Sequence, residues 1–205
     1  MSVQLLLMAK APVAGRVKTR LCPPATPVQA ARVAAAALAD TIGVLSATPA
    51  GRRTIVLSGR YRVPDGWHAA VQRGDGLAQR LVHGFADTAT GTPSLLVGMD
   101  TPQLTPGLLA DAADALRRSD AVLGPAADGG WWALGLREPA HAVALWTVPM
   151  SMPDTGERTL AALRARGLGV ALLPTLRDVD TAADAHAVAA LCPGGRFAAA
   201  VRELP

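Results

Sequence analysis

The chain has 205 residues, half of them hydrophobic, so it can bury a substantial core, and we expect one domain over residues 1–205. The formal charge of +4 comes from scattered basic residues and aromatic residues make up only 3% of the chain, which argues against a nucleic-acid partner. The lack of signal-peptide and membrane-spanning patterns, and of metal-finger spacing around Cys22 and Cys192, favours a cytoplasmic protein with no membrane partner.

Strand and helix patterns alternate along the chain, which is typical of βαβ units. The first half predicts strands at residues 3–9, 54–57 and 68–72, and helices at 28–45 and 77–87. The second half predicts strands at 94–98, 121–124, 131–135 and 169–173, and helices at 106–118, 154–166 and 182–191, the first of these capped by Thr105 and the second by a capping box at Asp154. Because Ala, Leu and Val dominate the apolar residues, we expect an α/β fold with a mostly parallel sheet.

A basic segment follows directly on the first predicted strand. It carries four cations, a proline and a glycine, at Lys10, Arg16, Lys18, Arg20, Pro12 and Gly15. Open α/β sheets bind ligands at the carboxyl ends of their strands, where this segment begins. A solvated basic loop is the alternative, but Pro12 and Gly15 give the segment a defined shape, and we interpret it as a polyphosphate site.

Three acidic segments also follow predicted strands. Asp100 comes after the strand at 94–98, Asp128 after the strand at 121–124, and Asp178 and Asp180 after the strand at 169–173. Neighbouring parallel strands share one rim at their carboxyl ends, so these carboxylates are expected to meet the basic segment there.

Carboxylates beside a phosphate-binding loop require a hard cation between them, so we infer a bound Mg²⁺ or Mn²⁺. Asp100 is the first choice of ligand, with an Asx turn as its alternative role. Asp178 and Asp180 share one face of an extended segment and can reach the same ion. The alternative for Asp180 and Thr181 is capping of the helix that begins at residue 182.

The segment Asp128-Gly129-Gly130-Trp131 predicts a wall for substrate. Glycines let the backbone approach a ligand, and a tryptophan offers a flat surface to a sugar or a base. A tight turn between two strands is the alternative. In a strand, one of Trp131 and Trp132 points into the core, so at most one of them contacts a ligand.

Four segments, in this order, resemble the DUF2064 family of the GT-A glycosyltransferase superfamily. They are residues 9–21, Gly98-Met-Asp100-Thr-Pro102, residues 124–136 and Asp178-Val-Asp180-Thr181. The stretch Lys18-Thr19-Arg20-Leu21 is also similar to the phosphate-binding segment of phospholactate guanylyltransferases. The chain departs from the family where Trp131 replaces a usual Tyr, and where Met-Asp-Thr-Pro replaces Ser-Asp-Cys-Pro.

The resemblance implies a three-layer α/β/α sandwich of the nucleotide-diphospho-sugar transferase type. It implies that Asp100 binds metal, and that Asp178 and Asp180 correspond to an acidic pair of the guanylyltransferases. We predict a nucleotide- and phosphate-binding set made up of Lys10, Pro12, Gly15, Arg16, Lys18, Thr19, Arg20 and Gly98.

We therefore predict a metal-dependent transferase with Asp100, Asp128 and Lys18 as its catalytic residues. Its partners are a nucleotide or nucleotide-sugar donor and a small-molecule acceptor. The leading hypothesis is glycosyl transfer, in which Asp128 orients or deprotonates the acceptor hydroxyl. The alternative is nucleotidyl transfer with release of pyrophosphate. A nucleotide sensor without turnover is a third possibility, which the acidic segments argue against.

Overall fold

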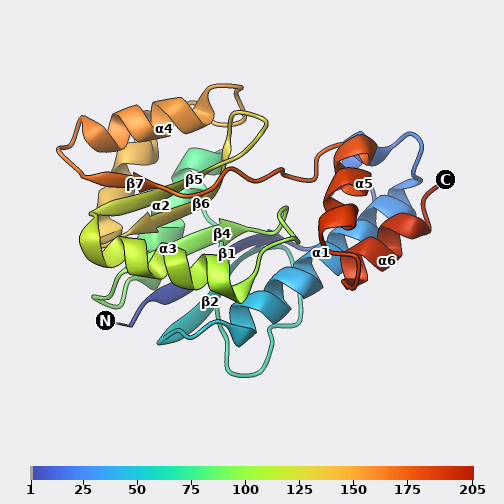
Figure 1. Ribbon diagram of the computed structural model, residues 1–205, viewed down its shortest axis with the longest axis horizontal. Coiled ribbons are helices and arrows are strands. Elements are labelled where there is room, and N and C mark those ends of the chain that lie inside the picture. The colour runs from blue at the N-terminus through green and yellow to red at the C-terminus, as the bar shows by residue number, and fades with distance from the viewer. Residues whose placement is uncertain (1) are drawn as a thin grey trace.

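The computed structural model describes residues 2–205 and contains one seven-stranded sheet in the order β3-β2-β1-β4-β6-β5-β7 (Figure 1). The strands are β1 (Gln4–Lys10), β2 (Arg52–Ser58), β3 (His68–Val71), β4 (Ser94–Gly98), β5 (Ala121–Pro125), β6 (Trp131–Leu136) and β7 (Val170–Leu172). Only β6 runs antiparallel to its neighbours, β4 and β5. The expected mostly parallel sheet is confirmed.

The helices that separate these strands are α1 (Pro27–Ala47), α2 (Leu77–Thr88), α3 (Pro106–Arg118), α4 (Thr155–Arg164), α5 (Ala182–Leu191) and α6 (Arg196–Arg202). Two 3₁₀ helices, η1 (Thr19–Leu21) and η2 (Pro139–Thr147), complete the set. Every strand and helix expected from the sequence is present, whereas α6, η1 and η2 were not expected.

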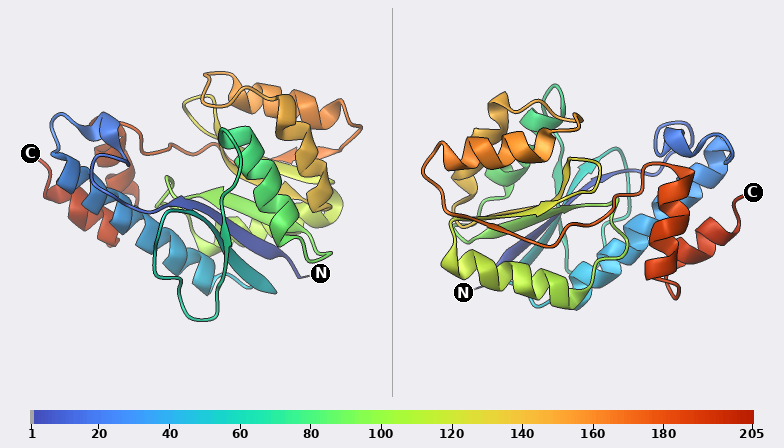
Figure 2. Two further views of the ribbon diagram at one scale, coloured as in Figure 1. Left: turned by 180° about the vertical axis from the view of Figure 1, so that it is seen from behind. Right: turned by 45° about the horizontal axis from the view of Figure 1, so that its top comes forward.

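Helices lie on both faces of the sheet (Figure 2), and one apolar cluster on each face joins them to it. One cluster joins α1 and α3 to the sheet through buried side chains such as Leu38, Leu109 and Ile55. The other joins α2, η2 and α4 to the opposite face through Phe85, Leu145 and Leu163. The three-layer α/β/α sandwich is confirmed.

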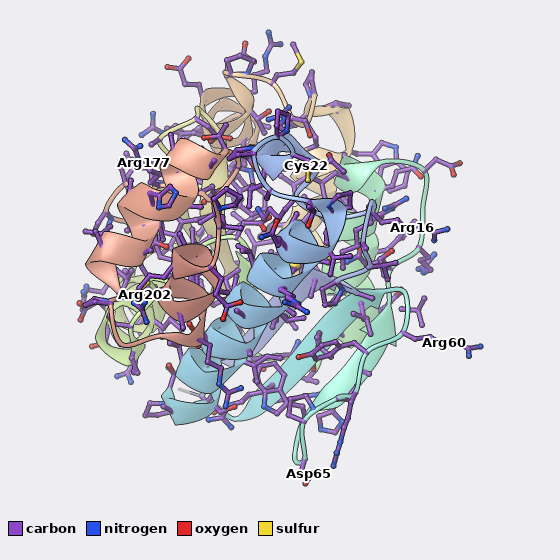
Figure 3. All side chains as sticks on the ribbon, turned by 90° about the vertical axis from the view of Figure 1, so that its right-hand side faces the viewer. Arg16, Cys22, Arg60, Asp65, Arg177 and Arg202 are labelled. Carbon is purple, nitrogen blue, oxygen red and sulfur yellow. The ribbon has the colours of Figure 1, made fainter. Side chains whose placement is uncertain are left out.

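A third apolar cluster lies beside the sheet, where α5 and α6 pack against α1 (Figure 3). It contains Phe197 of α6 and Val33 of α1. It also contains Leu21, at the end of the basic segment, and Val179, which lies between the two aspartates of the last acidic segment. One cluster therefore anchors two segments that are about 160 residues apart in the sequence.

Helix α1 is the one described helix that is long and apolar enough to cross a membrane, judged by length and composition alone. The sequence analysis expected no apolar stretch long enough to cross a membrane, and it did not recognise this helix. Its apolar side chains are used within the protein, because Leu38 and Leu45 pack on the sheet while Ala30 and Val33 pack on α5 and α6.

Of the two helix caps predicted from the sequence, the one at Thr105 is confirmed. The Thr105 hydroxyl accepts a hydrogen bond from the Leu108 amide at the start of α3. The capping box expected at Asp154 is wrong: within the described chain its carboxylate makes no cap hydrogen bond to α4. Instead it pairs with the Arg158 guanidinium at 2.7 Å, one helical turn further on.

Candidate active site

The carboxyl ends of β1 and β4 bring the basic segment and the first acidic segment together. These strands are parallel neighbours, with Met8 opposite Gly98. Just beyond them the Lys10 amide lies 3.3 Å from the Met99 sulfur. Between residues 10 and 20 the backbone turns at Gly15 (φ +75°) and again at Lys18, a non-glycine residue with φ +48°. A basic loop and an acidic loop therefore share one rim, as expected from the order of elements.

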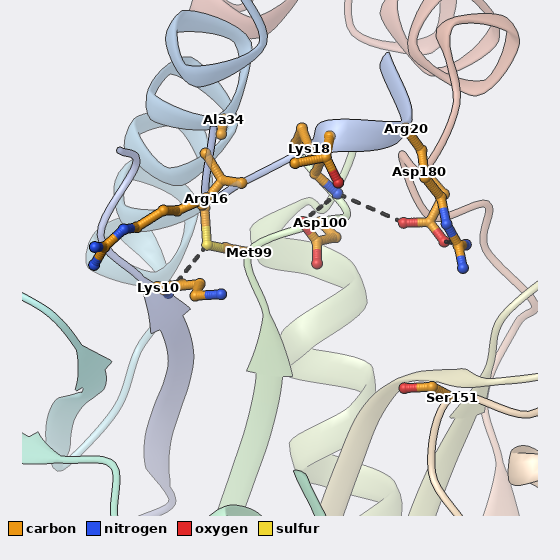
Figure 4. A pocket seen from close by; sticks show the side chains of 11 residues that line it. Lys10, Arg16, Lys18, Arg20, Ala34, Met99, Asp100, Ser151 and Asp180 are labelled. Carbon is orange, nitrogen blue, oxygen red and sulfur yellow. Dashed lines mark hydrogen bonds and ion pairs between the residues drawn. The ribbon is translucent and has the colours of Figure 1, made fainter. Parts of the chain in front are cut away.

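A first cavity of about 510 Å³ opens between these loops (Figure 4). All four predicted cations line it, together with Met99, Asp100, Ser151 and Asp180. Figure 4 shows Lys10 and Arg16 toward one end of the cavity, with Lys18 and Arg20 nearer the two aspartates. The cationic end is suited to phosphate groups.

The Lys18 ammonium lies among acceptor oxygens. It is 2.5 Å from Asp100 Oδ1 and 3.8 Å from Asp180 Oδ1, and it donates to the Val179 carbonyl. Its side chain is only 8% exposed, whereas those of Asp100 and Asp180 are 43% and 40% exposed. Arg20 Nη1 adds a contact of 3.2 Å to Asp180 Oδ2. A buried cation thus bridges the acidic segments.

Asp178 is the most perturbed carboxylate of the site. Its Oδ1 atom is buried and has no hydrogen-bond partner within residues 2–205. Burial, then the negative charges of Asp100 and Asp128, and to a smaller extent that of Asp180, raise the pKa of Asp178 to about 7, although Lys18 acts in the opposite direction. Four carboxylates therefore lie close enough to influence one another, so an added positive charge would stabilise the group.

The donor chemistry of this group fits a hard divalent cation, because it consists of aspartate oxygens and includes one buried atom without a partner. Among the described residues, no three His, Cys, Asp or Glu side chains are arranged so that they could bind one metal ion together. The Lys18 ammonium lies between Asp100 and Asp180 instead. The donor atoms are therefore of the kind that a divalent cation takes, while the position between two of them is held by the Lys18 ammonium.

A second cavity of about 590 Å³ adjoins the first, and four residues line both: Arg20, Asp100, Ser151 and Asp180. Its walls also carry Asp128, Asp178, Gly98 and Gly130. Apolar side chains from β1, β4, β6, α2 and the segment 150–153 complete it. The site therefore has a cationic compartment and a mixed acidic and apolar compartment that meet at Asp100.

Asp128 both shapes a turn and faces the second cavity. Its Oδ1 accepts a hydrogen bond of 2.8 Å from the Gly130 amide, which is the turn alternative, while its exposed carboxylate lines the cavity. Gly129, at φ +88°, is needed for packing: a Cβ atom there would lie 1.7 Å from the Pro153 carbonyl oxygen. This close approach fixes the turn against the segment before α4.

The two tryptophans of β6 point in opposite directions, as the alternation of a strand requires. Trp132 is buried in the cluster under α1 and α3, and its Nε1 donates to the Pro174 carbonyl at 3.0 Å. Trp131 is half-buried on the other face, and its Nε1 donates to Thr159 Oγ1 at 3.2 Å. Both tryptophans line the second cavity, but Trp132 is only 2% exposed, so the accessible ring surface there belongs to Trp131.

The family model described as an uncharacterized protein conserved in bacteria, DUF2064, matches residues 29–152, more than half of the chain. The chain belongs to the DUF2064 family. The matched range includes Asp100 and Asp128, while the basic segment and the pair Asp178 and Asp180 lie outside it. No curated protein matches this DUF2064 chain.

Solved structures resemble the DUF2064 chain over nearly its whole length. A protein from Desulfovibrio desulfuricans G20, provisionally named a nucleotide-diphospho-sugar transferase, is 26% identical, with a TM-score of 0.82 and coverage of 99% of this chain and 98% of that one. Rv0371c from Mycobacterium tuberculosis H37Rv, in complex with manganese, is 22% identical, with a TM-score of 0.59 and coverage of 92% and 97%. CMP:2-keto-3-deoxy-manno-octonic acid synthetase complexed with CTP is 12% identical, with a TM-score of 0.62 and coverage of 94% and 99%. The last two likenesses show the fold alone.

The structure places most of the predicted residues of the DUF2064 protein in the two cavities. Thr19 lines the first and Gly98 the second. Of the predicted residues, all of which are described, Pro12, Gly15 and Gly129 line neither cavity.

Sequence reasoning missed the segment Met150 to Thr155, which lines the second cavity. Ser151 of this segment lines both cavities and has a φ of +60°. A non-glycine residue in that conformation is strained, which marks functional segments, but the sequence around Ser151 carries no signal of it.

Proposed function

We propose that this DUF2064 protein is a metal-dependent transferase that moves a sugar from a nucleotide-diphospho-sugar to the hydroxyl group of a small acceptor. The observation that carries the proposal is the pair of cavities of different character that meet at Asp100 and Asp180. A phosphate-bearing donor suits the cationic cavity and an acceptor suits the other. The relative from Desulfovibrio desulfuricans, named for the same donor class, supports this assignment.

The first cavity holds the diphosphate of the donor. Lys10 and Arg16 contact one part of it, and Arg20 and Lys18 the part nearer the second cavity. These charges are fixed by the protein before reaction, so they offset the negative charge that the leaving nucleoside diphosphate gains when its bond to the sugar breaks. The cavity walls also hold the sugar carbon near the acceptor.

Asp100, Asp178 and Asp180 would hold the divalent cation, and the manganese complex of Rv0371c supports a metal in this fold. When bound, Mg²⁺ or Mn²⁺ supplies positive charge next to the diphosphate. Lys18 pairs with Asp100 and also lines the first cavity, so its ammonium would be able to contact phosphate oxygens of the donor.

Asp128 acts on the acceptor. The hydrogen bond from the Gly130 amide fixes its carboxylate at the wall of the second cavity. As the acceptor oxygen forms its bond to the sugar carbon, the bond from that carbon to the diphosphate breaks and the hydroxyl proton passes to Asp128. The products are a glycosylated acceptor and a nucleoside diphosphate.

Nucleotidyl transfer is the second candidate. Four cations suit a triphosphate, and the CTP complex of the synthetase relative supports this donor in the same fold. In that reaction a phosphate oxygen of the acceptor attacks the α-phosphorus and pyrophosphate leaves. Asp128, on the wall of the second cavity, would repel such an acceptor phosphate, and nucleotidyl transfer is therefore the second candidate.

The test is to incubate the purified protein with panels of nucleotide sugars and of nucleoside triphosphates, with Mg²⁺, Mn²⁺ or a chelator and a set of small alcohols. We expect release of nucleoside diphosphate from a nucleotide sugar and loss of this release with the chelator. Release of pyrophosphate from a triphosphate would establish the second candidate. Tight, metal-independent nucleotide binding without turnover of any donor would make the protein a sensor.

A further inference from the structure

We propose that the acceptor is an uncharged molecule with an apolar body, an aromatic or aliphatic alcohol, and that this body binds in the second cavity. This inference rests on the proposed function, because it names the substrate class of the acceptor compartment. Four features of the cavity carry it: its floor, its rim, its methionines and its charges.

The floor of the cavity is part of the apolar core. Leu81 of α2 and Leu96 of β4 belong to the cluster between the sheet and α2, and they line the cavity from below. Met8, Trp131 and Met150 pack against the same cluster and are only partly buried. An apolar ligand would therefore extend an existing core, and removing its surface from water favours binding.

The rim is apolar as well. Leu77, in the first turn of α2, is 44% exposed, and Met152, before α4, is 50% exposed. Both line the cavity although they lie in different segments. Large apolar side chains left exposed at the edge of a cavity with an apolar floor gain contacts when a ligand covers them.

Methionines are concentrated here. Three of the five methionines in the chain, Met8, Met150 and Met152, line this one cavity. An unbranched thioether side chain adapts to ligands of different shape. The cavity is therefore expected to accept several alcohols with apolar bodies rather than one rigid shape.

The charges of the cavity disfavour an anionic acceptor. Its wall carries Asp100, Asp128, Asp178 and Asp180. Among the described residues Arg20 is the only Lys or Arg on this wall, and it is paired with Asp180 at 3.2 Å. A divalent ion held by three of these aspartates would still leave Asp128 facing the acceptor. A phosphate or carboxylate placed beside the Asp128 carboxylate would therefore be repelled.

Equilibrium binding tests this inference without turnover. Ligand-observed NMR titrations compare 2-phenylethanol with 2-phenylethyl phosphate and with glycerol, using the full chain saturated with a nucleoside diphosphate so that the cationic first cavity is already filled. We expect 2-phenylethanol to bind at least about tenfold more tightly than either, which corresponds to about 1.4 kcal/mol. Equal binding of the three compounds, or preference for the phosphate ester or glycerol, would overturn the inference.

Variants locate the binding. Leu77→Asn combined with Met152→Gln should weaken 2-phenylethanol binding several-fold and leave nucleotide binding unchanged. Leu191→Asn is the matched control, since Leu191 is also an exposed helical leucine, at 68%, and lines neither cavity among the described residues. The inference fails if the control weakens binding as much as the double variant.

The two proposals fail separately. If no donor is turned over but 2-phenylethanol still binds through Leu77 and Met152, the transferase proposal is wrong and the apolar site stands. If a nucleotide sugar is turned over but polar or anionic acceptors are preferred, the transferase stands and the acceptor class is wrong.

Discussion

Asp100 has the central position among the residues of the site, because it lines both cavities and contacts the Lys18 ammonium. Asp100→Asn keeps the size of the side chain and removes its charge. Loss of one preorganised electrostatic group in an active site costs on the order of 100-fold in rate, and we expect that loss of transfer for this variant. The measurement is release of nucleoside diphosphate from the best donor.

Circular dichroism and thermal melting of Asp100→Asn provide the control for that experiment. The side chain is 43% exposed, so the fold should be retained. Turnover within twofold of the parent protein would remove Asp100 from the reaction. If Asp100→Asn does not fold, its loss of turnover says nothing about the reaction, and Asp100→Ser is measured in its place.

Lys18 competes with a divalent cation for the same carboxylates, because its ammonium lies between Asp100 and Asp180. In the Lys18→Met variant Mn²⁺ alone should bind about tenfold more tightly, a change of about 1.4 kcal/mol. Nucleotide-diphosphate binding in the presence of Mn²⁺ should weaken, since one phosphate contact is lost. Mn²⁺ binding is followed by electron paramagnetic resonance and nucleotide binding by calorimetry. Unchanged or weaker Mn²⁺ binding would show that Lys18 does not hold the cation position.

At the level of elements, the adjacent residues Asp180 and Thr181 at the start of α5 have different roles. The Thr181 hydroxyl accepts from the Asp184 amide, and the Asp184 carboxylate accepts from the Thr181 amide, so these two residues form a capping box. The Asp180 side chain takes no part in it and points into the first cavity beside Lys18 and Arg20 (Figure 4). The sequence left capping by Asp180 or Thr181 open, and the structure assigns it to Thr181.

This division predicts opposite effects for neighbouring variants. Thr181→Ala should lower the free energy of unfolding by about 1 kcal/mol, the usual cost of a lost cap. Asp180→Asn should change it by less than about 0.5 kcal/mol, as partly exposed substitutions usually do, but should lower transfer by about tenfold or more. Urea denaturation and the donor assay measure the two effects. The division of roles is wrong if Asp180→Asn unfolds as readily as Thr181→Ala.

The elements themselves follow from local sequence, whereas part of the site does not. The strand at residues 94–98 and the helix from Pro106 are predictable because apolar periodicity and caps are local signals. The capping box at Asp154 fails because Arg158, one turn later, takes its carboxylate. The segment around Ser151 joins the site through Pro153, whose carbonyl approaches Gly129, and such a long-range contact leaves no pattern in either segment.

For the whole molecule, the third apolar cluster connects the two sides of the donor cavity. Leu21 ends the basic segment and Val179 lies between Asp178 and Asp180, and both side chains are fully buried in that cluster. The cations and the aspartates are therefore positioned by one body of packed side chains, to which α5 and α6 contribute. Because α6 was not expected from the sequence, this connection could be found only in the structure.

The two phenylalanines of the chain test this connection, since each is fully buried in a different cluster: Phe197 in the third, and Phe85 in the cluster that floors the acceptor cavity. Phe197→Leu and Phe85→Leu should each lower the free energy of unfolding by about 1–3 kcal/mol. Donor binding, measured by calorimetry at a temperature where both variants are folded, should weaken in Phe197→Leu and stay unchanged in Phe85→Leu. Binding of 2-phenylethanol should instead weaken in Phe85→Leu and stay unchanged in Phe197→Leu. Equal donor binding by the two variants would mean that the third cluster does not position the donor cavity.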